Sequence, residues 1–400
     1  MYKILIVNKF FYKRGGDCTY TMNLARLLEQ QNHEIAIFAM QYHENINSGW
    51  DTYYPSEVVF SGGSLKSKIL ATSRLMGFAG VKSSFLKILD DFKPDIVHLN
   101  NIHSYLSPII AKLAHNRGIK VVWTLHDYKL ICPAYSCLRD GKVCELCFLE
   151  PLSVLMKKCM KRSWTASIMA YIEAKRWNRN QIEPYVDSFI CPSSFMANKM
   201  KQAGYNEKKL NVLCNFIEFD KSRNACNQKA DIREQAYCYI GRLSKEKGLK
   251  QLLEVATSLQ YKLYIAGEGP LKDILEKKYA CEKIIFLGKL DNDEVSRLLR
   301  HVQFSVLPSI WYENSPLSII ESLCMGTPVL AANIGGIPEL INDENGLLFK
   351  PNNLNDLGDK IIYLLKKRSF NNEMIQTSSA DRFSSKNYYN RLIEIYNDNK

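Results

Sequence analysis

The chain has 400 residues, of which 46% are hydrophobic and 24% are charged. This composition is typical of globular proteins and excludes a collagen-like, coiled-coil or disordered chain, and the length favours two domains over one. The 53 Lys and Arg against 41 Asp and Glu give a net charge of +12, which favours phosphates, nucleic acid or anionic lipid as partners without choosing among them.

No stretch reaches the roughly 18 to 20 consecutive apolar residues that span a bilayer. The segment that begins MYKILIVNKFF lacks the small-residue cleavage region of a secretory signal. We therefore expect a cytoplasmic protein. Its 12 cysteines should stay reduced and serve as buried small side chains, reactive thiols or metal ligands.

Short apolar runs alternate with segments of helical periodicity through the first half of the chain. A helix is expected over 19–30, and strands are expected over 3–7, 34–40, 96–99, 120–125 and 188–191. This alternation predicts βαβ units around a parallel sheet.

The pattern restarts after the polar segment 218–235, which we expect to link two domains. Strands are expected there over 236–240, 262–266, 283–287, 304–307 and 328–331. The predicted fold class is α/β, with two doubly wound domains whose ligands bind where loops leave the carboxyl ends of the strands. The expected domains are 1–217, with a Cys-rich insertion at 132–159, and 236–380. A C-terminal helix within 381–400 is expected to pack back on the first domain, and the active site is expected in the cleft between the domains.

Two loops are candidates for binding phosphate. Gly15 and Gly16 follow strand 3–7, and a glycine pair lets the backbone approach an anion that the N-terminus of the next helix attracts. In the loop 241–248, Arg242 can donate two hydrogen bonds to phosphate oxygens and Lys247 adds a positive charge. The alternatives are a tight turn and a solvated basic loop. The loop of Gly15 and Gly16 lacks the G-x-G-x-x-G spacing of a nicotinamide or flavin site.

The segment 311–329 combines two glutamates with a predicted helix start. Pro316 is a good first residue for a helix over 317–325 that stops at Gly326. Glu313 precedes this helix and Glu321 lies within it, so the two carboxylates would be roughly 10 to 12 Å apart at helical rise. That separation suits opposite ends of an extended ligand, with the backbone amides of 315–317 facing an anionic group between them.

These motifs occur in an order that resembles the retaining glycosyltransferases of family 4, which have the GT-B fold of two Rossmann-like domains. The resemblance rests on the glycine pair, GRLSKEKG at 241–248, GEGP at 267–270, the glutamates eight residues apart, and TPV and GGIPE within 327–339. It spans nearly the whole chain. One departure is that Asn314-Ser315 stands where the family usually has Phe-Gly, a change that bears on sugar choice and keeps the backbone amides.

The resemblance also implies roles for individual residues. Glu313 would hold the donor sugar hydroxyls and Glu321 the ribose. The remaining donor-binding residues implied are Gly15, Gly16, Arg242, Lys247, Glu268, Asn314, Ser315, Pro316 and Leu317.

His126 ends strand 120–125, where the family often has a histidine near the reacting sugar. We expect it to orient groups and act through electrostatics on the acceptor side, with a structural role as the alternative. His98 and His103 end a different strand and are weaker candidates.

The implied activity is transfer of a sugar, with retention, from a nucleoside-diphosphate-sugar to a saccharide acceptor. The acceptor is expected to be lipid-linked, in bacterial surface polysaccharide synthesis at the inner membrane face, and no cofactor is expected to be required for catalysis. A sugar-nucleotide epimerase of the same fold and a non-enzymatic zinc scaffold at the membrane remain alternatives.

Five of the 12 cysteines fall within 28 residues, at 132, 137, 144, 147 and 159. Cys144 and Cys147 form a two-residue knuckle of the kind that closes structural zinc sites. The predicted ligand set is Cys132, Cys144, Cys147 and Cys159, with Cys137 as a substitute, and reduced thiols without metal are the alternative. Asp291-Asn292-Asp293 resembles a metal motif, but its position before a helix predicts capping.

The segment 152–179 carries seven Lys and Arg among apolar residues. This pattern suits contact with an anionic membrane surface, with a core-facing helix and a solvated basic side as the alternative. No nucleic-acid-binding module is recognised, so nucleic acid is not an expected partner.

Overall fold

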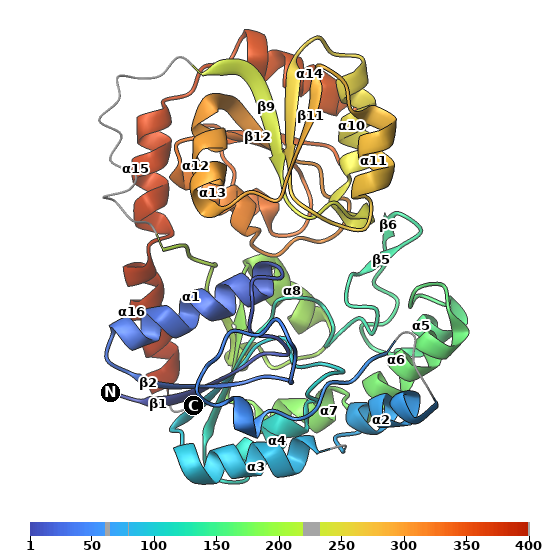
Figure 1. Ribbon diagram of the computed structural model, residues 1–400, viewed down its shortest axis with the longest axis vertical. Helices are drawn as coiled ribbons and strands as arrows, with labels where there is room; N and C mark the ends of the chain where they lie inside the picture. Colours follow the sequence, from blue (N-terminus) through green and yellow to red (C-terminus); the bar gives the residue numbers. More distant parts are fainter. Residues whose placement is uncertain (61–64, 79, 219–232, 399–400) are drawn as a thin grey trace. The chain divides into compact units, whose positions relative to one another are not determined.

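A six-stranded parallel sheet forms the centre of each of two units in the computed structural model (Figure 1). The structure describes residues 1–60, 65–78, 80–218 and 233–398. Unit 1 comprises Met1–Cys137, Cys144–Leu213 and Tyr389–Lys400, and unit 2 comprises Leu138–Val143 and Cys214–Tyr388. The predicted linker 218–235 lies almost entirely outside the described residues.

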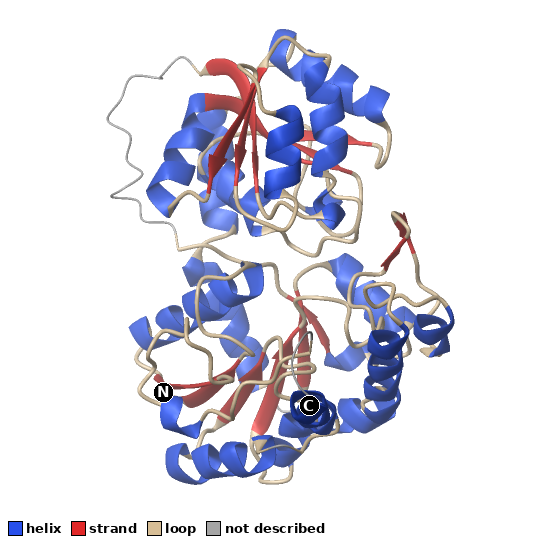
Figure 2. Ribbon diagram, turned by 45° about the vertical axis from the view of Figure 1, so that its right-hand side comes forward, coloured by secondary structure: helices blue, strands red, loops and turns tan. Residues whose placement is uncertain are grey.

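In unit 1 the strand order is β2-β1-β3-β4-β7-β8. The strands are β1 (Lys3–Val7), β2 (Glu34–Phe38), β3 (Ile96–Leu99), β4 (Lys120–Thr124), β7 (Ser188–Cys191) and β8 (Leu210–Val212). The helices are α1 (Gly16–Gln30), α2 (Leu65–Leu75), α3 (Val81–Phe92), α4 (Ile109–His115), α5 (Leu152–Met156), α6 (Trp164–Arg176), α7 (Arg179–Ile182) and α8 (Ser194–Gln202). Strands β3 and β7 are buried along their whole length, as expected for a parallel sheet covered by helices on both faces (Figure 2).

In unit 2 the strand order is β11-β10-β9-β12-β13-β14. The strands are β9 (Glu234–Ile240), β10 (Lys262–Ala266), β11 (Ile284–Gly288), β12 (Val302–Leu307), β13 (Val329–Ala332) and β14 (Gly346–Phe349). The α-helices are α10 (Leu249–Thr257), α11 (Lys272–Tyr279), α12 (Asn292–His301), α13 (Leu317–Cys324), α14 (Leu354–Lys366) and α15 (Asn372–Arg382). A small hairpin, β5 (Leu138–Arg139) and β6 (Lys142–Val143), is grouped with this unit.

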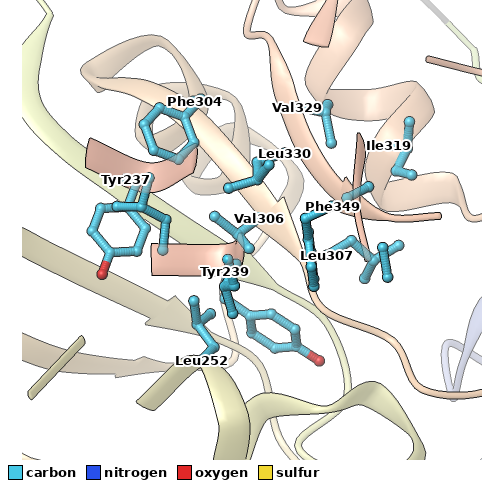
Figure 3. Close-up of a cluster of buried hydrophobic side chains, with 14 of the residues drawn as sticks. Tyr237, Tyr239, Leu252, Phe304, Val306, Leu307, Ile319, Val329, Leu330 and Phe349 are labelled. Atoms are coloured by element: carbon cyan, nitrogen blue, oxygen red, sulfur yellow. The ribbon is translucent and has the colours of Figure 1, made fainter. Parts of the chain in front are cut away.

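Aromatic and branched side chains of β9, β12, β13 and their helices fill the core of unit 2 (Figure 3). Tyr237 of β9 stacks on Phe304 of β12 with ring centroids 5.5 Å apart. Leu252 of α10 and Ile319 of α13 bury their side chains in the same cluster. Both sheets confirm the prediction of two doubly wound α/β domains.

The order of the strands reverses at one point in each sheet. In unit 1 the reversal lies between β1 and β3, and in unit 2 it lies between β9 and β12. Loops that leave the carboxyl ends of such strands border the crevice in which doubly wound proteins bind ligands. The loops after β1 and β3 and those after β9 and β12 are therefore the places to look for functional side chains.

The C-terminal helix α16 (Ser385–Asn397) packs on unit 1 through its last two turns. Its Tyr396 hydroxyl hydrogen-bonds to Nδ1 of His98 at 2.6 Å, and Lys120 Nζ donates to the Tyr396 carbonyl at 2.8 Å. The chain end is thus held by the buried strands β3 and β4. Among the described residues, no helix is both long and apolar enough to cross a membrane.

Gly248, after β9, lies directly against the backbone of the loop after β12. It has φ +69°, and a Cβ atom built on it would lie 1.8 Å from the carbonyl oxygen of Pro308. Since that oxygen belongs to the backbone, a side chain cannot be accommodated without moving the loop that carries Glu313.

We predict that Gly248→Ala lowers the free energy of unfolding by more than about 3 kcal/mol, because a steric clash adds to the roughly 1 to 2 kcal/mol cost of left-handed backbone. Gly288→Ala is the matched control, since Gly288 also has φ +69° but a Cβ there makes only ordinary contacts. Urea unfolding of both variants measures the difference. Equal destabilisation would contradict the close approach.

Candidate active site

The loops after β9 and β10 are bonded to each other through their backbones. The Gly241 N–H donates to the Ala266 carbonyl at 3.0 Å, and the Leu243 N–H donates to the Glu268 carbonyl at 2.9 Å. A Cβ on Gly267 would lie 1.9 Å from the Gly241 carbonyl oxygen. The glycines of the 267–270 motif thus let two strand-end loops pack backbone to backbone, which fixes the position of the 241–248 loop.

Arg242 and Lys247 lie in this fixed loop but differ in their surroundings. Arg242 is exposed, and its guanidinium has no hydrogen-bond or ion-pair partner among the described residues. Lys247 ends a short 3-10 helix, and its Nζ lies 2.5 Å from Oε1 of Glu313 in the loop after β12. The Arg242 guanidinium therefore has all its donors available to a ligand, whereas the Lys247 ammonium uses one of its three N–H donors on a carboxylate.

Glu313 is almost completely buried, with 6% of its surface exposed. Besides the Lys247 ammonium, the hydroxyl of Ser309 donates to its Oε1 at 2.6 Å. Its backbone is held by Gly336, whose N–H donates to the Glu313 carbonyl at 2.7 Å. Gly335, with φ +64°, has no room for a Cβ, which would lie 2.3 Å from the same carbonyl oxygen. The GGIPE motif thus holds the backbone of Glu313 in place.

The electrostatics of Glu313 result from two opposing effects. Burial raises the pKa of a carboxyl group, but the charge of Lys247 and the hydrogen bonds from Lys247 and Ser309 outweigh it. The pKa of Glu313 is therefore below its ordinary value, and the side chain is ionised at neutral pH.

Glu321, on α13, is in the opposite situation. Burial alone raises its pKa to about 7. Among the described residues its carboxylate has no hydrogen-bond or ion-pair partner. A carboxylate left unpaired in this way is suited to accept hydrogen bonds from the hydroxyl groups of a ligand.

The start of α13 leaves backbone donors available. Pro316 is the N-cap residue rather than the first helical residue, and no side chain caps the helix. Amides at this end, beginning with Leu317, can therefore bind an anion. Ser315 has a structural role, since its hydroxyl accepts from the Asn215 N–H at 3.3 Å and its carbonyl accepts from the Asn215 side chain at 2.7 Å. Asn314 lies beside it in the same loop.

Glu268 differs from the other predicted donor-binding residues. Its carboxylate is at the surface and pairs with Lys272, one turn along the chain, at 2.7 Å. Its backbone carbonyl is used in the loop contact with Leu243. The structure therefore shows a local role for Glu268 in joining the loops.

In unit 1, Gly15 and Gly16 begin α1, three residues earlier than predicted. Gly15 is the N-cap residue in an extended conformation, and it has no capping side chain. A Cβ on Gly16 would meet nothing within 4 Å, and one on Gly15 would meet only the Asp17 side chain. The space beside the N-terminus of α1 is therefore open, and packing within the described residues does not require glycine at these positions.

His126 lies with residues from the loops after β1 and β3. Its Nε2 donates to Oδ1 of Asn100 at 2.9 Å, and its ring contacts Tyr20 edge-on with centroids 4.8 Å apart. Because Asn Oδ1 only accepts hydrogen bonds, this contact places the proton on Nε2. Burial lowers the pKa of His126 to about 4, despite the opposing charge of Asp17. The imidazole is therefore neutral at physiological pH.

Asp17, Lys9 and Asn101 surround His126 and were missed by the sequence analysis. Asp17 accepts from the Asn101 amide at 2.7 Å and pairs with Lys9 at 3.7 Å. Burial raises the pKa of Asp17, but Lys9, His126 and Asn101 lower it to a net value of about 2. The available signal was the position of these polar residues directly after buried strands, or in the first turn of α1.

The two weaker histidine candidates have structural environments. Both ring nitrogens of His98 are used, by Tyr396 and by the Thr124 hydroxyl at 2.8 Å. His103 stacks on Trp123 with centroids 5.2 Å apart. Asp291 caps α12 in a capping box with Glu294, which confirms the prediction for the Asp291-Asn292-Asp293 motif.

The cysteines of the insertion lie close enough for their charges to interact. A hydrogen bond with Cys137 lowers the pKa of Cys132 to about 7. Burial raises the pKa of Cys147, and the charges of Cys132, Cys159 and Cys144 raise it further. Within the described ranges, however, no group of three or more His, Cys, Asp or Glu side chains is arranged to hold a metal ion. The geometry does not assemble the set Cys132, Cys144, Cys147 and Cys159, and zinc stays a prediction.

Comparison with known protein families agrees with this arrangement. Residues 14–221 match the family described as Glycosyltransferase Family 4, and residues 222–381 match Glycosyl transferases group 1. The chain belongs to this class of glycosyltransferases, and its fold is the GT-B fold that the sequence motifs predicted.

Similar individual proteins include bacterial and archaeal ones. A 42.6 kDa protein of the cps region of Klebsiella pneumoniae is 27% identical, over 84% of this chain and 87% of that protein. An uncharacterized glycosyltransferase of Methanocaldococcus jannaschii is 27% identical, over 96% of this chain and 94% of its own length. Among solved structures, HepE from Anabaena in complex with UDP and glucose superposes with a TM-score of 0.64, 18% identity and coverage of 98% and 99%.

The raised pKa of Glu321 predicts a pH dependence of stability. The folded chain keeps this carboxyl protonated up to about pH 7, whereas the unfolded chain ionises it near pH 4.5. Folding therefore loses stability as the pH rises from about 4.5 to 7, by on the order of 3 kcal/mol. We expect Glu321→Gln to lose less stability than the wild type between pH 5 and pH 8 in urea unfolding.

Glu344→Gln is the control for this measurement, since Glu344 is exposed in the same unit. It should show the same pH dependence as the wild type. If Glu321→Gln also follows the wild type, the raised pKa of the half-buried Glu321 is refuted.

The zinc prediction is tested by metal analysis. If the thiols of the insertion close around zinc, protein purified without chelators contains about one zinc per chain, and removing it destabilises unit 1. Added magnesium should not restore stability, because a thiolate site does not suit that ion. Protein that is folded and active but contains no metal would contradict the zinc prediction, and the cysteines would then be reduced thiols that only pack together.

Proposed function

We propose that the chain transfers a sugar from a nucleoside-diphosphate-sugar to a hydroxyl of a saccharide acceptor with retention of anomeric configuration. The acceptor is proposed to be lipid-linked, in the synthesis of a bacterial surface polysaccharide at the cytoplasmic face of the membrane. The observation that carries the donor assignment is the set of charges at the switch point of unit 2. There, Lys247 pairs with the buried carboxylate of Glu313, and Arg242 in the same loop as Lys247 has no side-chain partner among the described residues.

Each part of a nucleotide sugar has a chemical counterpart in this set. Arg242 and Lys247, with the backbone amides that begin α13, suit a diphosphate. The ionised Glu313 can accept hydrogen bonds from sugar hydroxyls. Glu321, which has no partner among the described residues, can accept those of a ribose.

The cations also suit the chemistry of the transfer. When the bond between the sugar C1 and the diphosphate breaks, its electron pair goes to the diphosphate oxygen, while the acceptor oxygen bonds to C1 and releases its proton. Negative charge therefore grows on the diphosphate in the transition state, where Arg242 and Lys247 stabilise it most. No residue is assigned as a covalent nucleophile.

Unit 1 is proposed to supply a second group of residues. The open N-terminus of α1, with Gly15 and Gly16, leaves room for a phosphate to approach the backbone. His126 is neutral, and its Nε2–H is fixed by Asn100, so it acts by hydrogen bonding and orientation rather than by charge.

The comparisons support the substrate classes. HepE was solved with UDP and glucose, which fits a nucleotide-sugar donor. Two similar proteins belong to cps regions of Klebsiella pneumoniae, which fits a role in surface polysaccharide synthesis.

The experiment is to incubate purified protein with UDP-, GDP- and ADP-sugars, each with and without a membrane extract as the source of acceptor. We expect one donor to be consumed only when the extract is present, with the sugar recovered in the lipid fraction. An altered nucleotide sugar formed without acceptor would instead identify an epimerase and overturn the proposal.

Arg242→Ala tests the diphosphate assignment. Arg242 is exposed and has no side-chain partner within the described ranges, so this variant should unfold like the wild type. We expect kcat/KM for the donor to fall by about 10²- to 10³-fold, the usual cost of losing one preorganised donor. The control is Arg297→Ala, which removes an exposed arginine elsewhere in unit 2. Unchanged turnover in Arg242→Ala would refute the assignment.

A further inference from the structure

Helices α5 and α6 form a helical hairpin in unit 1 (Figure 1). Each helix carries exposed apolar side chains. The buried side of α6 carries Ser167, Ala170 and Glu173. Its opposite side carries Trp164, Ile168 and Ile172, which are spaced four residues apart and therefore form one line along the helix. On α5, Leu152 and Met156 are exposed in the same four-residue spacing.

These five side chains are 40–64% exposed. In globular proteins, large apolar side chains of a helix normally face the core. The apolar stripe of α6 thus lies outside the face that packs on unit 1, on the side of the helix that is exposed to solvent. A cluster of exposed large apolar side chains indicates a surface that binds another apolar phase.

The turn between the two stripes is strongly basic. It carries Lys157, Lys158, Lys161 and Arg162, all exposed. No carboxylate among the described residues pairs with Lys157, Lys158 or Lys161, and Lys158 lies over the Trp164 ring with Nζ 4.6 Å from its centroid. The charges of these three lysines are therefore not paired with a carboxylate in the part of the chain that the structure describes, and they adjoin the apolar stripe.

The backbone of this turn is left-handed at three positions, and all three are basic residues. Lys158, Lys161 and Arg162 have φ of +48°, +51° and +55°. Left-handed backbone costs about 1 kcal/mol or more at a residue other than glycine. Three of the four basic residues of the turn thus have strained backbone. Strained backbone is often found at functional sites, so this turn is a candidate for one.

We propose that α5, α6 and their connecting turn form a docking surface for an anionic lipid bilayer. The stripe residues Leu152, Met156, Trp164, Ile168 and Ile172 enter the interfacial region, and the basic turn contacts lipid phosphates. Charge alone would also suit nucleic acid. A row of apolar side chains makes no favourable contact with a nucleic acid backbone. The same side chains gain free energy when they enter the interfacial region of a bilayer, where tryptophan is especially common.

The test is flotation of the full-length protein with vesicles of phosphatidylglycerol or of phosphatidylcholine, without donor or acceptor. The protein should float with phosphatidylglycerol vesicles at low salt and not with phosphatidylcholine vesicles. Raised salt should weaken binding because it screens the basic turn. Since no sugar transfer is measured, failure here leaves the proposed function standing, and failure of transfer leaves this proposal standing.

Two triple variants separate the two components of the surface. Trp164→Gln, Ile168→Gln and Ile172→Gln together should weaken vesicle binding more than about 10-fold, through lost apolar burial. Lys157→Gln, Lys158→Gln and Lys161→Gln together should weaken it by about 100-fold at low salt, given the energy of each basic residue near an anionic surface. All six positions are exposed, so folding should persist, and thermal unfolding verifies this.

Each variant has a matched control. Ile274→Gln, Leu354→Gln and Met374→Gln remove three exposed apolar residues of unit 2, and Lys82→Gln, Lys87→Gln and Lys93→Gln remove three exposed charges at α3. Both controls should bind vesicles like the wild type. The proposal is overturned if the wild type does not bind phosphatidylglycerol vesicles or if test and control variants bind equally. It is also overturned if the apolar variant only converts a dimer to a monomer in sedimentation.

Discussion

The ion pair between Lys247 and the buried carboxylate of Glu313 is the constraint around which the site of unit 2 is built. An ionised carboxylate is costly to bury, and removing its partner from such a pair typically costs about 3 to 5 kcal/mol. The surrounding backbone therefore has to bring the loops after β9 and β12 together without a gap. Gly248 lies against Pro308, Gly335 lies against Glu313, and the Ile310 N–H donates to the Glu246 carbonyl at 3.0 Å.

The two units apply the same topological rule with different residues. In each sheet the strand order reverses once, and polar groups gather where the loops on either side of the reversal begin. Unit 2 places there an ion pair and the exposed cation of Arg242. Unit 1 places a neutral His126 beside an ionised Asp17 and an open helix N-terminus. One unit thus offers charge for an anionic ligand, and the other offers oriented hydrogen bonds.

The fold was largely predictable because buried parallel strands such as β3 read as short apolar runs between periodic helices. Strand β8 was missed because Leu210–Val212 is short and partly exposed, and β14 because Gly346 begins it. The motifs also predicted that Lys247 and Glu313 matter, but not that they bind each other, since 66 residues separate them in the chain. Asp17 and Asn101 were missed because their importance comes from strands that become neighbours only in the folded sheet.

A double-mutant cycle on Lys247→Met and Glu313→Gln tests the central claim most directly. The measurement is the free energy of unfolding in urea of the wild type, both single variants and the double variant. If the buried pair organises the site, the double variant is less destabilised than the sum of the single variants, with a coupling energy of about 1 to 3 kcal/mol. Effects that add to within about 0.3 kcal/mol would contradict the account.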